Sequence, residues 1–197
     1  MDEIVLKAMM RWPNVPAVYG WLKLDIKGRW LLQGDPITNT TIKNFISRNY
    51  ESNDKGQWYF QNGPQKVFVE LEYTPYIYKI WRNSENRLIA ETHTGQAVNS
   101  PISCWLDEQG NLSIESELGI GAIEPTSLPT LINQLTHGDG SEISDRTLDA
   151  MLLGNFNVLC SVELKWNNLK LPLKFVEFKK LSEQFGFDPF PLPDNEK

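Results

Sequence analysis

Residues 11–34 read RWPNVPAVYGWLKLDIKGRWLLQG, and this stretch predicts a β-hairpin. Two prolines near its start disfavour a helix at the entry. Apolar residues then alternate with other types over residues 18–26, which is typical of a strand. Asp25 and Gly28 are typical of the first and fourth positions of a tight turn, because an Asp side chain can hydrogen-bond the backbone two residues on and Gly accepts a positive φ. Trp30 opens the second strand.

The spacing of this turn recurs along the chain. Each copy begins with Asp or Asn, has a residue tolerant of positive φ three positions later, and continues into a large apolar residue two positions after that. Asn replaces Gly in one copy, which is permitted because Asn visits the left-handed region readily. Four hairpin turns are therefore predicted, at residues 25–28, 53–56, 83–86 and 107–110. The segments between them differ in length, so no internal repeat is inferred.

A C-terminal hairpin is predicted from the residues that would face each other across its turn. If residues 167–168 form a two-residue turn, every pair on one face is apolar, and a shift of one residue destroys the match. The pairs are Trp166 with Leu169, Leu164 with Leu171, Val162 with Leu173, and Cys160 with Phe175. On the other face Lys165 opposes Lys170 unless Glu163 relieves the repulsion. Pro172 on that face indicates an edge strand.

These elements predict a β-rich α+β protein. An antiparallel sheet of hairpins over residues 15–118 would pack on one amphipathic helix at 41–50. A smaller C-terminal section would hold two short helices and the hairpin 158–178. Pro75 interrupts the longest strand signal, at 65–82, and marks a bulge, a bend or an edge.

The length of 197 residues suits one compact domain, 1–197. A change in composition after residue 119 indicates sub-lobes at 1–122 and 123–186. The proline-rich residues 187–197 are predicted to form an extended tail.

Composition excludes several classes of function. A formal net charge of −6 is the wrong sign for a general nucleic-acid binder or a polybasic membrane surface. No apolar run approaches the roughly 20 residues that span a bilayer. The N-terminus is acidic where a secretion signal is basic, so we expect a cytoplasmic protein. The two cysteines, Cys104 and Cys160, are read as buried and reduced rather than as a disulfide or a nucleophile.

Only weak candidates for chemistry remain. The sequence has two histidines, His93 and His137. His137, Asp139 and Asp145 lie in one turn-rich loop that could hold a divalent cation, although the spacing fits a calcium loop poorly. An exposed loop with a capping residue is the simpler interpretation. No phosphate loop, nucleophile elbow, paired-cysteine metal site or dinucleotide fingerprint is present, and no cofactor is predicted.

A surplus of aromatic residues in the β-rich part is the other candidate. Core packing is the favoured interpretation, and a ligand platform is the alternative. The residues proposed for ligand contact are Trp12, Tyr19, Trp21, Trp58, Tyr76 and His93.

The functional hypothesis is a non-catalytic binding or protein-interaction module with an aromatic-rich sheet face. The partner would be an unknown protein or small molecule, with no nucleic acid and no membrane, and the chain would be a monomer or a homodimer. The alternative is a hydrolase-like or metal-assisted enzyme that uses His93 or His137 with nearby carboxylates.

Several runs of sequence resemble a family of uncharacterised bacterial proteins of about this length. They are RWPNVPAVYGWLKLDIKGRWLLQGDPI, WYFQNGPQKVFVELEYTPYIYKI and ETHTG, together with ISRNY at 46–50. The resemblance covers mainly residues 11–95. It implies a soluble bacterial protein, and it implies no activity, ligand or catalytic residue.

Overall fold

The computed structural model describes residues 1–152, 157 and 161–193. Backbone contacts divide the chain into two units. Unit 1 comprises Met1–Pro75, His93–Gly95 and the described part of Ser182–Lys197, and unit 2 comprises Tyr76–Thr92 and Gln96–Leu181. The predicted division near residue 122 therefore falls inside unit 2.

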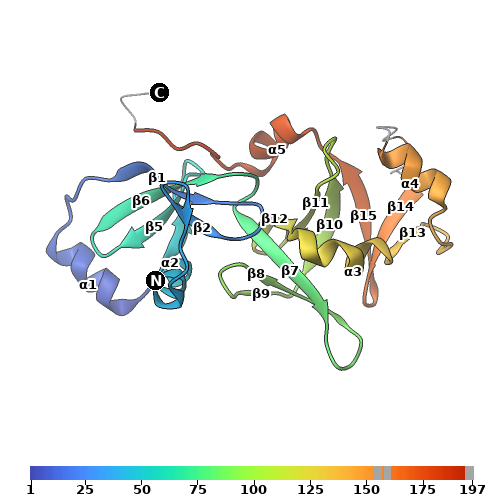
Figure 1. Ribbon diagram of the computed structural model, residues 1–197, viewed down its shortest axis with the longest axis horizontal. Coiled ribbons are helices and arrows are strands. Elements are labelled where there is room, and N and C mark those ends of the chain that lie inside the picture. The colour runs from blue at the N-terminus through green and yellow to red at the C-terminus, as the bar shows by residue number, and fades with distance from the viewer. Residues whose placement is uncertain (153–156, 158–160, 194–197) are drawn as a thin grey trace. The chain divides into compact units, whose positions relative to one another are not determined.

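The sheet of unit 1 is mixed (Figure 1). Its order is β3-β2-β1-β6-β5-β4. The strands are β1 (Val18–Leu24), β2 (Trp30–Leu32), β3 (Asp35–Pro36), β4 (Tyr50–Ser52), β5 (Trp58–Asn62) and β6 (Gln65–Leu71). All neighbours are antiparallel except β1 and β6, which run parallel with Leu22 opposite Val69. The long connection through the helix between β3 and β4 allows this parallel pair, because parallel neighbours need a crossover.

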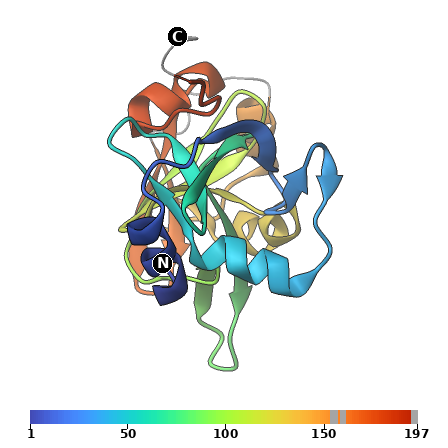
Figure 2. The same ribbon diagram turned by 90° about the vertical axis from the view of Figure 1, so that its left-hand side faces the viewer.

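That helix, α2 (Thr40–Arg48), joins β3 to β4 beside the sheet (Figure 2). Its N-cap is Asn39, whose side chain accepts hydrogen bonds from the amides of Thr41 and Ile42. Ile46 is buried and Phe45 meets Phe60 edge-to-face, with ring centroids 5.4 Å apart. The amphipathic helix predicted at 41–50 therefore forms, but it ends at Arg48, with Asn49 as its C-cap and Tyr50 as the first residue of β4.

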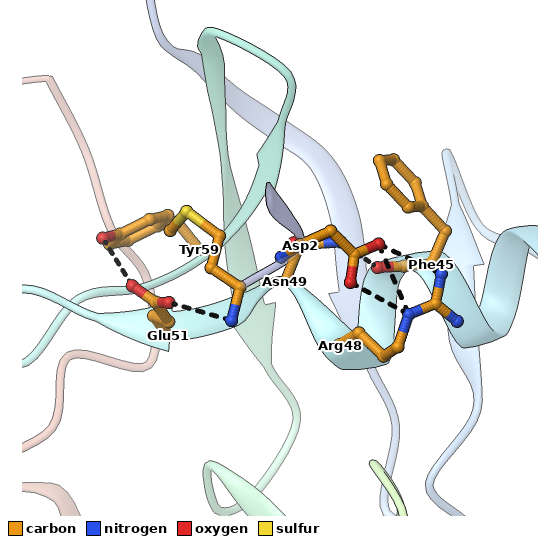
Figure 3. Close-up of polar contacts among 7 residues, drawn as sticks. Asp2, Phe45, Arg48, Asn49, Glu51 and Tyr59 are labelled. Carbon is orange, nitrogen blue, oxygen red and sulfur yellow. Dashed lines mark hydrogen bonds and ion pairs between the residues drawn. The ribbon is translucent and has the colours of Figure 1, made fainter. Parts of the chain in front are cut away.

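A short N-terminal helix, α1 (Glu3–Arg11), is held to α2 through Asp2 (Figure 3). The Asp2 amide donates to Asn49 Oδ1 at 2.7 Å, and its carboxylate pairs with the Arg48 guanidinium at 3.1 Å. Hydrogen bonds from Arg48 lower the pKa of Asp2. Val5 is 1% exposed and supplies the buried face of the helix, whereas Ile4, Leu6 and Met10 of the same helix are exposed.

The segment after α5 (Phe178–Phe185) docks on unit 1. The Asp188 amide donates to the carbonyl of Gly56 at 2.9 Å, and the Leu71 amide donates to the carbonyl of Pro189 at 2.9 Å. A Cβ atom at Gly56 would collide with the carbonyl oxygen of Gly186, so this approach needs glycine as well as the positive φ of its turn.

The sheet of unit 2 is also mixed, in the order β13-β14-β15-β10-β11-β12-β7-β8-β9. Its strands in chain order are β7 (Tyr76–Arg82), β8 (Leu88–Thr92), β9 (Ala97–Val98), β10 (Pro101–Leu106), β11 (Leu112–Ser116), β12 (Gly119–Ile123), β13 (Leu135–His137), β14 (Val162–Trp166) and β15 (Leu169–Phe175). The pairs β12–β7 and β10–β15 are parallel. Pro75 lies between β6 and β7, and the strand signal at 65–82 is therefore two strands in two sheets.

The predicted β-rich α+β class is confirmed. The expected single antiparallel sheet is replaced by two mixed sheets, because three parallel pairings, β1–β6, β7–β12 and β10–β15, join strands that are distant in sequence. The C-terminal hairpin is likewise part of the second sheet rather than a separate section.

All four predicted turns form, and they share one geometry. In each, the Oδ1 atom of the first residue accepts the amides two and four positions later, at 2.7–3.0 Å. The fourth residue has a positive φ in every copy, between 60° and 83°. The first residues are Asp25, Asn53, Asn83 and Asp107. The side chain thus closes the turn and fixes the register of the strands on either side.

The C-terminal hairpin has the predicted register. Trp166 pairs with Leu169 and Leu164 with Leu171, while Cys160 lies outside the described residues. Lys165 does oppose Lys170, and the Lys170 ammonium lies 3.2 Å from Glu163. The prediction of an edge strand from Pro172 is wrong, because β15 lies between β14 and β10. The pairing with β10 starts at Leu173, so the ladder does not need the amide that Pro172 lacks.

Candidate functional site

A cavity of about 290 Å³ lies in unit 2 between two helices and the β10–β11 turn. The helices are α3 (Leu128–Ile132) and α4 (Asp145–Leu152). The described lining residues are Leu106, Asp107, Glu108, Gln109, Gly110, Leu112, Leu128, Ile132, Leu135, Leu148 and Met151. The volume is close to the lower end of the range for small-molecule sites, about 300 Å³.

Local sequence explains how each wall forms. Leu128 and Ile132 are four residues apart on α3, and Leu148 and Met151 are three apart on α4, so each pair shares one helical face. Proline in the first turn of α3 and a hydrogen bond from the Thr147 amide to Ser144 Oγ, at 3.2 Å, favour these helix starts.

The third wall comes from the ends of β10 and β11, where Leu106 and Leu112 are direct antiparallel partners. Leu135 completes the apolar lining. A helix over 128–135 is expected from the sequence, but Leu135 begins β13 and pairs with Leu164. The helix α3 ends at Ile132, and Leu135 then pairs with β14.

The polar part of the lining is the turn at 107–110. Asp107 is buried, and its carboxylate accepts the amides of Gln109 and Asn111 and the side-chain amide of Asn111. Glu108 is exposed and accepts the amide of Phe178 at 2.8 Å. The described lining contains no His, Cys, Ser, Thr, Lys or Arg. The cavity is therefore lined mainly by apolar side chains, with two carboxylates on one side.

The residues proposed for ligand contact differ in burial and in the residues that they contact. His93 and Trp58 both meet Tyr50, with ring centroids 5.6 Å and 4.8 Å apart, and His93 also lies 5.0 Å from Trp30. This cluster is packing inside unit 1. Burial lowers the pKa of His93 to about 3, so its imidazole is neutral at neutral pH.

The other predicted aromatic residues have different surroundings. Tyr19 stacks on Phe68 at 4.5 Å, and Tyr76 is a buried residue of unit 2 that stacks near Tyr78. Trp12 and Trp21 are 50% and 54% exposed. Of the six residues, these two tryptophans are the most exposed, at about one half.

The loop proposed for metal binding is a hydrogen-bonded turn. Asp139 Oδ1 accepts the Ser141 amide at 2.9 Å and the Ser141 hydroxyl at 2.7 Å, and these bonds lower the pKa of Asp139. Asp145 is the first residue of α4. Across the described ranges, no group of three or more His, Cys, Asp or Glu residues is arranged to hold a metal ion.

Cys104 is free and fully buried, and burial raises the pKa of its thiol to about 12. Such a thiol remains protonated and unreactive at neutral pH. Cys160 lies outside the described residues. A helix of the length and apolar character that spans a bilayer does not occur in the described part of the chain.

Sequence reasoning missed the cavity. The shared faces of Leu128 with Ile132 and of Leu148 with Met151 are visible in the sequence, as is the turn at 107–110. The spacing within each element is a local signal, whereas the meeting of the three elements depends on sheet pairings that the sequence does not specify.

These features define a β-rich α+β protein with two mixed sheets and an apolar cavity in unit 2. The chain belongs to the family described as "Protein of unknown function (DUF2946)", whose model matches residues 1–192. The resemblance to an uncharacterised family is thus confirmed. No curated protein matches the chain.

Two solved structures are similar. One is a DUF1285 family protein from Silicibacter pomeroyi DSS-3, with 17% identity and a TM-score of 0.53, covering 89% of this chain and 97% of that one. The other is a DUF1285 family protein from Shewanella baltica OS155, with 15% identity and a TM-score of 0.42, covering 55% of this chain and 87% of that one. The first likeness concerns the fold alone.

Proposed function

We propose that the protein is a non-catalytic binding protein and that the cavity of unit 2 takes a small, mainly apolar molecule. The observation that carries the proposal is the mainly apolar lining, contributed by α3, α4, Leu135 and the β10–β11 hairpin. An apolar cavity of about 150 Å³ is large enough for benzene. The volume here is about twice that, which suits a ligand of roughly a dozen non-hydrogen atoms.

The lining chemistry supports binding rather than catalysis. A general base works best when its pKa is near the operating pH, and an activated nucleophile needs such a base beside it. The described lining offers neither a histidine nor a hydroxyl or thiol nucleophile. His93, in unit 1, has a pKa of about 3 and is a poor base at neutral pH.

The expected affinity is modest. Burying eight methylenes gains about 6 kcal/mol at about 0.8 kcal/mol each. Part of this is lost to the ordering of the ligand on association. An eight-carbon probe should therefore bind with a Kd of roughly 100 μM to 1 mM.

The test is titration calorimetry with 1-octanol, an uncharged eight-carbon probe. Leu148→Trp places a large ring at the cavity wall and should abolish the binding heat. Leu169→Trp is the matched control, because Leu169 is exposed, also lies in unit 2 and does not line the cavity. Circular dichroism of both variants verifies folding. Absence of saturable binding to the unmodified protein would refute the proposal, as would equal binding by the folded Leu148→Trp variant.

A further inference from the structure

The charged residues of the cavity lining all have one sign. Asp107 and Glu108 are acidic, and the other described lining residues are uncharged. Both acids belong to the β10–β11 turn, so the negative charge is concentrated on one side of an otherwise apolar chamber. A polar group of a bound ligand would be unsatisfied against the apolar walls, whereas beside the β10–β11 turn it lies near these carboxylates.

The two carboxylates differ in what they can offer a ligand. Asp107 is 1% exposed, and both of its oxygens accept hydrogen bonds within the turn. Glu108 is exposed, and its Oε2 atom accepts the Phe178 amide at 2.8 Å. Within the described residues, Oε1 of Glu108 receives no hydrogen bond. The contact with Phe178 positions this carboxylate while leaving one oxygen to receive a donor.

We propose that the ligand is a small amphiphile with a positively charged amine, whose ammonium group binds Glu108 while its apolar body fills the cavity. This inference rests on the proposed function, because it specifies the ligand of the same site. Charge complementarity is its basis: an ammonium group has three donors and no acceptor, so it matches a carboxylate, whereas a carboxylate head would face two like charges.

The experiment compares three probes with the same chain and different heads: octylamine, 1-octanol and octanoate, each titrated into the full chain at about pH 7, where the amine and the acid are both charged. Octylamine should bind most tightly and octanoate least, with about a tenfold ratio between them, since each partly exposed charge pair contributes modestly. Added salt should reduce this ratio, because exposed charges are screened.

Glu108→Gln removes the charge and keeps an oxygen that can accept the Phe178 amide. It should reduce the ratio of octylamine to octanoate affinity by at least about threefold, and octanol affinity should change less than octylamine affinity. Glu85→Gln is the matched control, because Glu85 is an exposed acid in the equivalent turn at 83–86 and does not line the cavity.

The outcomes separate the two proposals. Equal affinity for the three probes, with loss of binding in Leu148→Trp, would uphold the cavity and overturn amine recognition. Loss of octanol binding in Glu108→Gln would show that Glu108 acts on structure, and would also overturn it. Failure of all three probes to bind would overturn the proposed function and this inference together.

Discussion

Gly121→Ala should be one of the most damaging single-methyl additions in this chain. Gly121 lies in β12 opposite Tyr76 of β7. A Cβ atom at this position would lie 2.5 Å from Cζ and 2.6 Å from Cε1 and Cε2 of Tyr78. The Tyr78 ring is fully buried, and its hydroxyl donates to the Gly119 carbonyl and shares a hydrogen bond with the Ser116 hydroxyl, each at 2.9 Å. The ring therefore cannot move away freely.

The expected loss is about 3 kcal/mol of unfolding free energy. Overpacking a well-filled core costs about 1–3 kcal/mol, and displacing the ring would sacrifice hydrogen bonds of about 1 kcal/mol each. Gly138→Ala is the matched control, since nothing lies within 4 Å of a Cβ there and φ is not positive. The control should change stability by no more than about 0.5 kcal/mol.

Urea unfolding followed by circular dichroism measures both variants against the unmodified protein. In a thermal melt, the unfolding midpoint of Gly121→Ala should lie roughly 6–12 °C below that of the unmodified protein, since each 1 kcal/mol lowers the midpoint of a chain of this size by about 2–4 °C. A Gly121→Ala variant as stable as Gly138→Ala would refute the close approach of β12 to the Tyr78 ring.

Three further predictions test other parts of the fold. First, the pKa of His93 is about 3 in the folded protein against 6.5 ordinarily, so between these pH values His93 is protonated in the unfolded state only. The free energy of unfolding should therefore fall by about 2 kcal/mol between about pH 7 and 5. Urea unfolding of His93→Phe should lack this part of the loss. Equal pH dependence in the two proteins would contradict the buried, neutral histidine. Second, Arg48→Ala removes the partner of Asp2, and amide hydrogen exchange in α1 should become faster while β6 is unchanged. Unchanged exchange in α1 would argue against this tether. Third, Asn83→Ala removes two side-chain hydrogen bonds and should cost about 1 kcal/mol in urea unfolding, and no loss would mean that the turn does not depend on its side chain.

Local chemistry made much of this fold predictable. The four turns follow from a side chain that bonds the next amides and a fourth residue that accepts a positive φ. The register of the C-terminal hairpin follows from the apolar match across residues 167–168. In both cases the interacting residues are close in sequence, so the signal is complete within a short window.

Long-range pairings were not predictable in the same way. The parallel contact of Leu22 with Val69 and that of Cys104 with Leu173 join residues far apart in sequence. Pro172 therefore indicates an edge strand in the sequence, although β15 lies between β14 and β10 in the sheet. The cavity was missed for the same reason, because it exists only where α3, α4 and the β10–β11 turn meet.

The aromatic residues show a related limit. The composition shows a surplus of aromatic residues, but it does not show which of their rings are buried. Trp58 and His93 are used in packing around Tyr50, whereas Trp12 and Trp21 are half exposed. A tryptophan in an alternating strand pattern can belong to either face, and the covering element decides which face is core.

The central claim is that the cavity of unit 2 binds a small apolar molecule. Its most direct test is a methyl NMR titration of the full chain with 1-octanol. The account predicts saturable shifts in the methyl groups of Leu128, Ile132, Leu148 and Met151, with the exposed Leu169 unmoved. Unchanged cavity methyl signals up to millimolar octanol, or shifts confined to residues outside the lining, would contradict it.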